Sequence, residues 1–458
     1  MTLESIAKKL PGGIQSIEHR ITCPLDHFNK DNTATIQVFI REVVASKHSD
    51  NTSLPLLVYL QGGPGFPSPR PGAPPSGWLK KALEEYRVLL LDQRGTGLST
   101  PITAQSCAHM TDDDQLAEYL SLFRADSIVH DLELFREKKF PNQKLTLLGQ
   151  SFGGFCILSY ISFFPQSLER LLFTVGLAPV TATIEQVYTA TYARMTERNR
   201  RYYQRYPQDK AIVGEIVHFL TKNPTPLPSG GILTARRFAT LGANLGFAGG
   251  MESLHYLLES AWFIHGQQLA TNFLISIDSM QSGFDTNPIY YFLHESIYCN
   301  GNEHSPSQWA AERIHAQTKV NGEPLFDWDR FSNIENVQEI AESAPLYFSG
   351  EMVFSWMADD YVGLRHFKGA AMKLAAKSDW QLLYNMDNLR DITIPTAALV
   401  SYDDVFVDRE LALATASILG DNCSCYITNE YQHSGLRDDP SVFEKLLKAS
   451  KGEIILPS

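Results

Sequence analysis

The sequence lacks several features that would place it in a familiar class at once. It has no run of about 18 apolar residues, and its first residues, MTLESIAKKLPGG, contain no apolar signal segment, so neither a transmembrane helix nor a secretory leader is predicted. Its six cysteines form no CxxC pair, and Cys423 and Cys425 have no second pair that would complete a zinc site. We therefore expect free thiols, no metal and a cytoplasmic, reducing location.

Positive charge is also scarce. The chain has 39 Lys and Arg against 51 Asp and Glu, a formal net charge of -12, which makes nucleic acid and anionic membranes unfavourable partners. Walker A and full G-x-G-x-x-G motifs are absent, so DQRGTGLS (residues 92–99) is not predicted to hold a nucleotide. We interpret it as a structural loop in which Arg94 pairs with Asp92.

What is present is the alternation of strand and helix patterns typical of an α/β protein. Alternating stretches at residues 15–27 and 35–45 predict an antiparallel pair of strands. Continuous apolar runs predict central strands of a parallel sheet that is covered on both faces. These runs are residues 54–60, 86–92, 144–149 and 170–177, with one helix at 125–140 between them, and strand character returns much later at 396–402 and 424–429.

The long interval between the two groups of strands is rich in helix formers. With 458 residues, the chain is also too long for one ordinary core. We therefore predict one α/β domain, made of residues 1–178 and 385–458, that is interrupted by a mainly helical insertion at residues 179–384.

The strongest chemical signal is G-Q-S-F-G-G at residues 149–154, between a predicted strand and an apolar helix. This is the context of the G-x-S-x-G turn that carries the nucleophile of α/β hydrolases. Gly149 and Gly153 give the clearance that such a sharp turn needs, and the helix N-terminus favours negative charge beside the serine. The alternative is a glycine-rich turn with an incidental serine, but the flanking elements favour Ser151 as a nucleophile.

The segment Q-G-G-P-G at residues 61–65 follows an earlier predicted strand and exposes backbone N–H groups with little steric cover. An acyl-transfer intermediate requires two such donors, one from the residue after the nucleophile, here Phe152, and one from a loop of this kind. Gly63 is the predicted second donor of this oxyanion hole. By itself the motif is equally typical of an ordinary turn.

In α/β hydrolases the acid and the base follow the nucleophile in that chain order. Among 13 histidines, His433 alone lies in a polar loop just after the last predicted strand, and it is the predicted base. The loop after the preceding strand offers Asp403, Asp404 and Asp408. Asp408 is expected to cap the helix that follows it, whereas the residues alone leave the choice between Asp403 and Asp404 open.

Nine blocks of the sequence resemble those of the prolyl aminopeptidase (proline iminopeptidase) family, particularly its longer-chain branch: GGPGFPSPRP, DQRGTGLST, GQSFGGFC, RRFATLG, HESIYC, WAAER, SGEMVFSWM, YDDVFVD and NEYQHSGLRDD. They run almost from end to end of the chain. The resemblance implies an α/β-hydrolase fold with a large helical cap, and a triad of Ser151, Asp404 and His433. Gln61 departs from the pattern, because many members have His there, but catalysis should survive since the donors are backbone amides.

The resemblance further implies that glutamates of the cap bind the free amino group of the substrate, which is largely cationic at neutral pH. Glu295 and Glu351 are the candidates, with Glu312 as a weaker third, and each is equally compatible with an ordinary ion pair. Three aromatic residues could line a site for the proline ring or belong to the core: Tyr298, Phe354 and Trp356.

The expected reaction is therefore release of N-terminal proline from a short peptide or aminoacyl amide through an acyl-enzyme, without a metal or organic cofactor. An esterase, amidase or acyltransferase acting on a small metabolite with the same triad is the alternative. A non-catalytic binding module is disfavoured because it would not need Ser, Asp and His in this order. The sequence does not indicate an oligomeric state.

Overall fold

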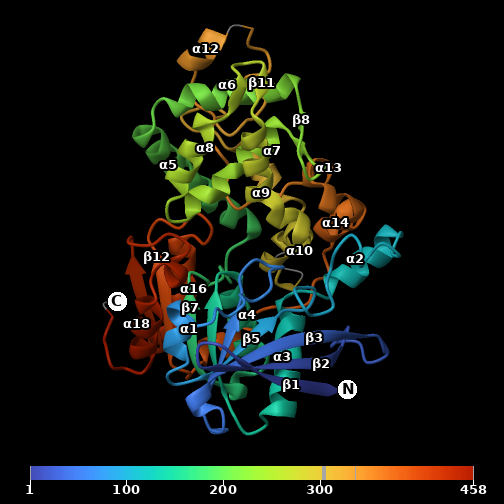
Figure 1. The fold of residues 1–458 in the computed structure, drawn as a ribbon, viewed down its shortest axis with the longest axis vertical. Coiled ribbons are helices and arrows are strands. Elements are labelled where there is room, and N and C mark those ends of the chain that lie inside the picture. Colours follow the sequence, from blue (N-terminus) through green and yellow to red (C-terminus); the bar gives the residue numbers. More distant parts are fainter. Residues whose placement is uncertain (1, 302–305, 336, 457–458) are drawn as a thin grey trace.

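The structure is a computed structural model that describes residues 2–301, 306–335 and 337–456. Figure 1 shows a lower layer built around a sheet and an upper, mainly helical layer. The sheet has nine strands in the order β1-β2-β3-β5-β4-β6-β7-β12-β13. Their bounds are β1 (Leu3–Leu10), β2 (Ile14–Pro24), β3 (Thr35–Ala45), β4 (Leu56–Leu60), β5 (Arg87–Asp92), β6 (Leu145–Gln150), β7 (Leu168–Thr174), β12 (Thr396–Ser401) and β13 (Cys423–Thr428).

The predicted α/β fold is confirmed, including the antiparallel pairing of β2 and β3. β3 also runs antiparallel to β5, and the remaining strands from β5 to β13 are parallel. Strand β1 was not predicted. This strand forms the edge of the sheet beside β2, and its central residues are exposed. Because neither face is buried, its sequence LESIAKKL shows no apolar alternation.

Both faces of the central strands are covered, as their continuous apolar runs predict. In β4, Leu57 and Val58 are fully buried on opposite faces, each in a different apolar cluster. One face packs against α3 (Ala125–Lys139), α4 (Phe152–Phe163), α15 (Met386–Arg390) and α16 (Arg409–Leu419). The other packs against α1 (Gly77–Ala82), α17 (Gly435–Asp438) and α18 (Ser441–Ser450).

The upper layer is formed mostly by the segment between β7 and β12 (Figure 1). Its first helix starts at a capping box, in which Thr183 and Gln186 each bind the backbone of the other. Two short hairpins, β8 (Thr225–Pro226) with β9 (Ile232–Leu233) and β10 (Trp262–Ile264) with β11 (Gln268–Leu269), were not predicted. The helices are α5 (Ile184–Arg205), α6 (Asp209–Lys222), α7 (Ala235–Ala239), η3 (Thr240–Gly246), α8 (Gly250–Glu259), α9 (Thr271–Thr286), α10 (Ile289–Leu293), η4 (Glu295–Tyr298), α11 (Ala310–Gln317), α12 (Val337–Glu342), α13 (Met357–Asp360), η6 (Val362–Phe367) and α14 (Lys368–Ala376).

The two layers exchange elements at their border. Helix α2 (Asp113–Ser121) precedes the insertion in sequence, yet it lies beside α14, and Leu116 and Leu120 join the apolar cluster of the upper layer (Figure 1). Conversely, Leu383 and Tyr384 belong to the apolar cluster on the sheet face that α3 and α4 cover. These contacts cross the proposed division at residues 178 and 384, because α2 packs with the insertion although it precedes it, and Leu383 and Tyr384 pack with the sheet domain although they precede residue 385. We call residues 179–384 the cap.

Two predictions about composition can be compared with the described residues. All six cysteines are free; four of them are buried, and Cys423 and Cys425 are half-buried. Among the residues that the structure describes, no helix is long and apolar enough to cross a membrane.

Candidate active site

The candidate nucleophile Ser151 lies at the turn between β6 and α4. Its backbone has φ 53° and ψ -123°, a conformation that costs a non-glycine residue about 1–3 kcal/mol. The turn is held by the N–H of Ser151, which donates to the carbonyl of Thr174 at 3.0 Å. A Cβ on Gly153 would lie 1.9 Å from the carbonyl oxygen of Leu60, and one on Gly149 would lie 2.6 Å from Gly153. Both glycines of the motif are therefore required by close backbone packing.

The glycine loop after β4 lies directly against this serine. A Cβ on Gly62 would come within 2.9 Å of the Ser151 Cβ, so only glycine lets the loop approach this closely. Gly63 has φ +131°. The loop is anchored through Gln61, whose carbonyl accepts from the Gln93 side chain at 3.0 Å and whose side-chain oxygen accepts from the Tyr59 hydroxyl at 3.0 Å. The structure thus places the predicted oxyanion loop beside the predicted nucleophile.

The other predicted donor, Phe152, is the first residue of helix α4. The N–H groups of the first helical turn have no intrahelical acceptor, so this amide is available at the same turn as the serine. Aligned peptide dipoles give the helix N-terminus a partial positive charge that favours an oxyanion there.

The candidate base His433 is buried in the loop after β13 and contacts Asp404, which follows β12. Their hydrogen bond joins His433 Nδ1 and Asp404 Oδ2 at 2.8 Å. The other oxygen of Asp404 accepts from the backbone N–H groups of Phe406 and Val407 at 2.8 and 3.1 Å. These donors orient the carboxylate, which in turn favours the tautomer with a proton on Nδ1 and leaves Nε2 free to accept a proton.

The three aspartates between which the acid was to be chosen have separate partners. Asp403 forms an ion pair with Arg201 of α5 at 2.7 Å. Asp408 caps α16, as predicted, by accepting from the N–H groups of Glu410 and Leu411. Only Asp404 among the three contacts the imidazole in the part of the chain that the structure describes.

Two backbone contacts bring the His433 loop to the nucleophile turn and to the cap. The side-chain amide of Gln150, the residue before Ser151, donates to the carbonyl of His433 at 3.0 Å. The N–H of His433 donates to the carbonyl of Gly246 in η3 at 3.1 Å. The ring of Phe406 meets the imidazole edge-on at 4.7 Å between centroids, which limits its rotation. Residues far apart in sequence therefore converge at one edge of the sheet.

The electrostatics favour a proton on this imidazole. Burial opposes a positive charge on His433, but the carboxylate of Asp404, with a smaller contribution from Glu351, outweighs burial and raises the pKa of His433 above its usual value. A histidine that accepts a proton more readily is a stronger general base once it is deprotonated.

Of the predicted cap glutamates, Glu351 lies in the electrostatic range of His433. Burial raises the pKa of Glu351, although His433 and the hydroxyl of Tyr290 act in the opposite direction. Its Oε2 lies 4.0 Å from Nε2 of His294, but burial lowers the pKa of His294 to about 3, so this contact brings no positive charge at neutral pH. Sequence analysis assigned no role to Tyr290 or to His294, although His294 opens the HESIYC block that contains Glu295.

Glu295 is the first residue of η4, and its buried carboxylate reaches the N-terminus of helix α11. Its Oε1 accepts from the N–H of Ala311 at 2.9 Å, whereas Oε2 is buried and has no hydrogen-bond partner among the described residues. Burial raises the pKa of Glu295 to about 7, even though nearby donors lower it. A buried, unpartnered carboxylate oxygen is what a cationic ligand would satisfy.

The remaining cap candidates have other partners. The weaker candidate Glu312 accepts from the N–H of Ser355 at 2.8 Å. Tyr298 packs its ring on Phe155, one turn along α4 from the nucleophile, at 5.9 Å. Phe354 and Trp356 instead stack on each other at 5.2 Å within the apolar cluster of the cap. Among the described residues, no group of three His, Cys, Asp or Glu side chains could hold a metal ion.

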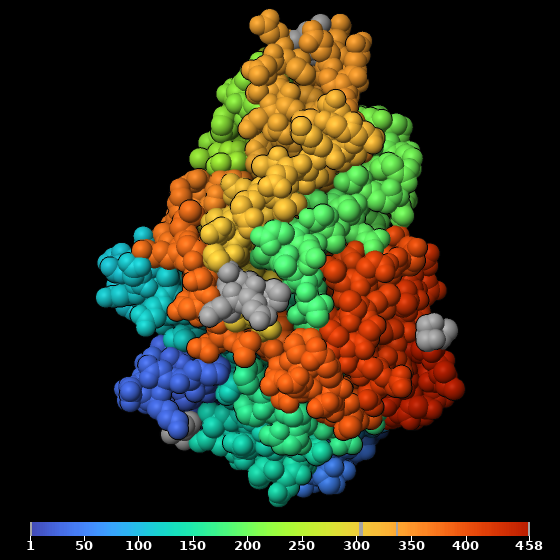
Figure 2. Space-filling model, turned by 180° about the vertical axis from the view of Figure 1, so that it is seen from behind, coloured from blue at the N-terminus to red at the C-terminus, as the bar shows by residue number. Residues whose placement is uncertain are grey.

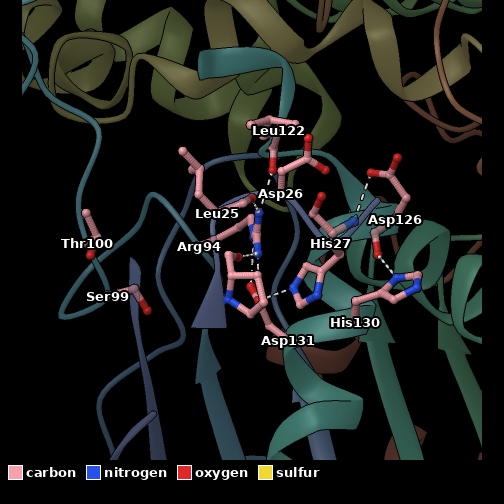
Figure 3. A network of polar contacts seen from close by, with 12 residues as sticks. Leu25, Asp26, His27, Arg94, Ser99, Thr100, Leu122, Asp126, His130 and Asp131 are labelled. Carbon is pink, nitrogen blue, oxygen red and sulfur yellow. Dashed lines mark hydrogen bonds and ion pairs between the residues drawn. The ribbon is translucent and has the colours of Figure 1, made fainter. Parts of the chain in front are cut away.

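The predicted pair of Arg94 and Asp92 is wrong. Figure 3 shows Arg94 pointing toward Asp131 of α3, with which it makes two hydrogen bonds at 2.6 and 2.7 Å. Its other donors reach the carbonyls of Pro24, Leu25 and Leu122. Asp92 pairs with Arg70 at 2.6 and 2.8 Å. Asp92 is the last residue of β5 and Arg94 lies in the turn that follows it, so each group finds its partner in a different segment.

Comparison with known proteins agrees with this geometry. A family model described as "alpha/beta hydrolase fold" matches residues 55–216. With the strand order and the serine turn, this match defines an α/β-hydrolase enzyme of the serine hydrolase class.

Two curated relatives are similar over nearly the whole chain. A proline iminopeptidase of Aeromonas sobria is 42% identical over 440 residues, covering 96% of this chain and 97% of the relative. A proline iminopeptidase of Aspergillus aculeatus is 34% identical, covering 97% and 95%. This chain belongs to the proline iminopeptidase family. The solved structure of a proline iminopeptidase from Mycobacterium smegmatis has a TM-score of 0.41 and 12% identity, covering 95% of this chain and 100% of that one, a likeness too distant to carry an argument.

Proposed function

We propose that this protein is a serine aminopeptidase that releases proline from the N-terminus of peptides, with Ser151 as nucleophile, His433 as base and Asp404 as the residue that orients the base. The observation that carries this proposal is the His433–Asp404 hydrogen bond, held against a strained serine turn through Gln150. Family membership supports the substrate, because both curated relatives are named proline iminopeptidases.

The reaction is acyl transfer. His433 Nε2 takes the proton of the Ser151 hydroxyl, and the oxygen attacks the prolyl carbonyl to give a tetrahedral oxyanion that accepts from the Gly63 and Phe152 N–H groups. His433 then donates its proton to the leaving amine as the C–N bond breaks. Water, deprotonated by His433, attacks the prolyl ester, which releases proline and restores the serine.

The amino group of the substrate is the second element of recognition. A prolyl ammonium brings one positive charge, and Glu295 and Glu351 are the carboxylates proposed to receive it. The unpartnered Oε2 of Glu295 and the proximity of Glu351 to His433 support this role. Binding the ammonium beside the base would fix the scissile bond one residue from the chain end, which distinguishes an aminopeptidase from an endopeptidase.

The decisive experiment compares Ser151→Ala with Ser121→Ala, a surface serine on α2. Rates are measured on prolyl-, alanyl- and leucyl-naphthylamide and on a simple naphthyl ester. We expect Ser151→Ala to lose at least about 10⁴-fold in kcat on the prolyl substrate with its fold intact, and Ser121→Ala to behave as the wild type. Undiminished proline release by Ser151→Ala would overturn the proposal. An enzyme faster on the ester than on every aminoacyl amide would favour the esterase or acyltransferase alternative.

We also propose a cytoplasmic location, short peptides or aminoacyl amides as substrates, and neither nucleic acid nor membrane as a partner. Free thiols at all six cysteines and the net charge of -12 support this. Fractionation of the cells that express the protein tests the location.

A further inference from the structure

Helix α5 of the cap reaches both loops that carry the acid and the base. From this helix, Nη2 of Arg198 donates to the backbone carbonyl of Asp403 at 3.1 Å and to the side-chain oxygen of Gln432. Asp403 immediately precedes Asp404, and Gln432 immediately precedes His433. One guanidinium group therefore bridges the chain neighbours of the two residues. Figure 2 shows the α5 segment, in green, lying directly against the red C-terminal part that holds both loops.

The bridge is buried and its partners are themselves fixed. Arg198 is only 8% exposed. The backbone carbonyl of Gln432 accepts from the Ser401 hydroxyl at 2.7 Å, so this residue is held at its backbone by β12 and at its side chain by α5. A planar guanidinium presents several donors in fixed directions, which a lysine ammonium at the same place would not.

A second cap contact supports the same loop. The carbonyl of Gly246 accepts the N–H of His433, and a Cβ on Gly246 would lie 2.4 Å from the ring of Phe406, which packs on the imidazole. The cap thus binds His433 through the backbone carbonyl of Gly246 and contacts both loops through Arg198.

We propose that Arg198 is a positioning residue for the triad. From the cap, it fixes the loop of Asp404 and the loop of His433 relative to each other. This inference rests on the proposed function. The hydrogen bond between Asp404 and His433 spans two loops that follow different strands, so its length depends on how those loops are held relative to each other. Misplacement of a catalytic group by about 1 Å costs about 100-fold in rate.

The same helix offers a matched control. Arg194 lies one turn earlier and pairs with Asp408 of the core at 2.7 Å, but its partner caps α16 and does not adjoin the acid or the base in sequence. Both arginines line one cleft of about 390 Å³ between α5 and the core. If Arg198 only fastened the cap to the core, loss of either arginine should have similar consequences.

The test compares Arg198→Ala, Arg198→Lys and Arg194→Ala in the full chain. Rates are kcat and KM on prolyl-naphthylamide and the rate of Ser151 labelling by a fluorophosphonate, which does not use the amino-group site. For Arg198→Ala we expect kcat and the labelling rate to fall together by about 30- to 100-fold, with KM changed less than about 3-fold. Arg198→Lys should be intermediate, because it offers a point charge, and Arg194→Ala should keep kcat within about 3-fold.

Guanidinium chloride at low millimolar concentration should raise the kcat of Arg198→Ala at least about 5-fold, because the space left by the side chain opens on the cleft. It should not change the kcat of Arg194→Ala. Wild-type kcat and labelling in Arg198→Ala, or equal losses in the two alanine variants, would overturn the inference. If Arg198→Ala does not fold, unchanged kcat in Arg198→Lys overturns it equally. The proposed function fails separately, if Ser151→Ala remains active.

Discussion

Among single residues, the two neighbouring aspartates after β12 differ most sharply in what surrounds them. Asp404 accepts three hydrogen bonds, one from the imidazole and two from backbone amides, while Asp403 pairs with Arg201, a half-exposed arginine on α5. A carboxylate that orients an imidazole sets the tautomer on which proton transfer depends. An ion pair exposed to water contributes little to stability.

We predict that Asp404→Asn lowers kcat about 10⁴-fold on prolyl-naphthylamide, since an amide can present a donor to Nδ1 and favour the wrong tautomer. Asp403→Asn, which keeps the backbone carbonyl used by Arg198, should lower kcat less than about 3-fold. Steady-state kinetics of the two variants checks this. Equal losses in both would show that Asp404 has no special role.

The charge of Glu351 has two separable effects. Its negative charge helps to raise the pKa of His433, and it is proposed to bind the substrate ammonium. Because the base must be neutral, activity falls as pH drops through the pKa of His433, and Glu351→Gln should move this acid limb to lower pH. The same variant should raise KM about 10- to 100-fold, the usual cost of a lost charged hydrogen bond.

The control for this prediction is Glu312→Gln, which removes a charge from the same cap while its amide oxygen can still accept from Ser355. Its acid limb and KM should match those of the wild type. A Glu351→Gln profile that moves to higher pH, or leaves KM unchanged, contradicts the account. The pH dependence of kcat/KM for both variants is the measurement.

Among the elements, the strand-turn-helix unit of β6 and α4 shows how the backbone dictates sequence. Gly153 in α4 faces the carbonyl of Leu60 in β4, where any side chain would overlap it. Gly283 in α9 is a helical glycine whose added Cβ would meet nothing closer than 3.7 Å. The two positions differ in their surroundings, because a backbone carbonyl lies against Gly153 whereas no atom crowds Gly283.

We predict that Gly153→Ala lowers the free energy of unfolding by about 3 kcal/mol or more and abolishes proline release, because α4 must move away from β4 and carry the serine with it. Gly283→Ala should instead be neutral or stabilise by up to about 1 kcal/mol, since alanine is the better helix former. Urea unfolding followed by circular dichroism measures both changes. Normal stability and activity in Gly153→Ala would contradict the described packing.

Most strands of the sheet could be predicted from sequence because their apolar runs are long and uninterrupted. Strand β1 could not, since it lies at the exposed edge and has no buried face to impose a pattern. The serine turn was predictable from a local motif, but the choice of Asp404 over Asp403 depends on which side chain points toward a residue 29 positions away. The role proposed for Arg198 could not be predicted for the same reason, because its partners come from two loops that are distant in sequence.

In the whole molecule, Arg94 connects segments that are remote in sequence. It is fully buried, pairs with Asp131 and donates to carbonyls at the end of β2 and after α2 (Figure 3). Removing one member of such a pair leaves an uncompensated buried charge, which costs about 3–5 kcal/mol. Arg70 is half-exposed, and its partner Asp92 is buried but also accepts from the N–H groups of Ser68 and Leu98, so loss of Arg70 should cost less.

We therefore predict that Arg94→Met lowers the free energy of unfolding by about 3–5 kcal/mol at pH 7, and Arg70→Met by less, about 1–2 kcal/mol, because Asp92 keeps its two backbone donors. Burial alone would raise the pKa of Asp131, but Arg94 outweighs it and holds that pKa below its usual value. The pair thus contributes stability above the unfolded pKa of Asp, about 3.9, that is lost as pH falls through the folded value. The difference between wild type and Arg94→Met should shrink toward pH 4, as Asp131 becomes protonated in the variant, and pH-dependent denaturation measures it.

The central claim is that one hydroxyl, at residue 151, carries the chemistry of this enzyme. Its most direct test is to label the wild-type protein with a fluorophosphonate, map the adduct by peptide mass spectrometry and follow proline release in the same samples. The account predicts one adduct per chain, on Ser151, with proline release lost in proportion to labelling. An adduct on another residue, or proline release that persists after complete labelling, would contradict it.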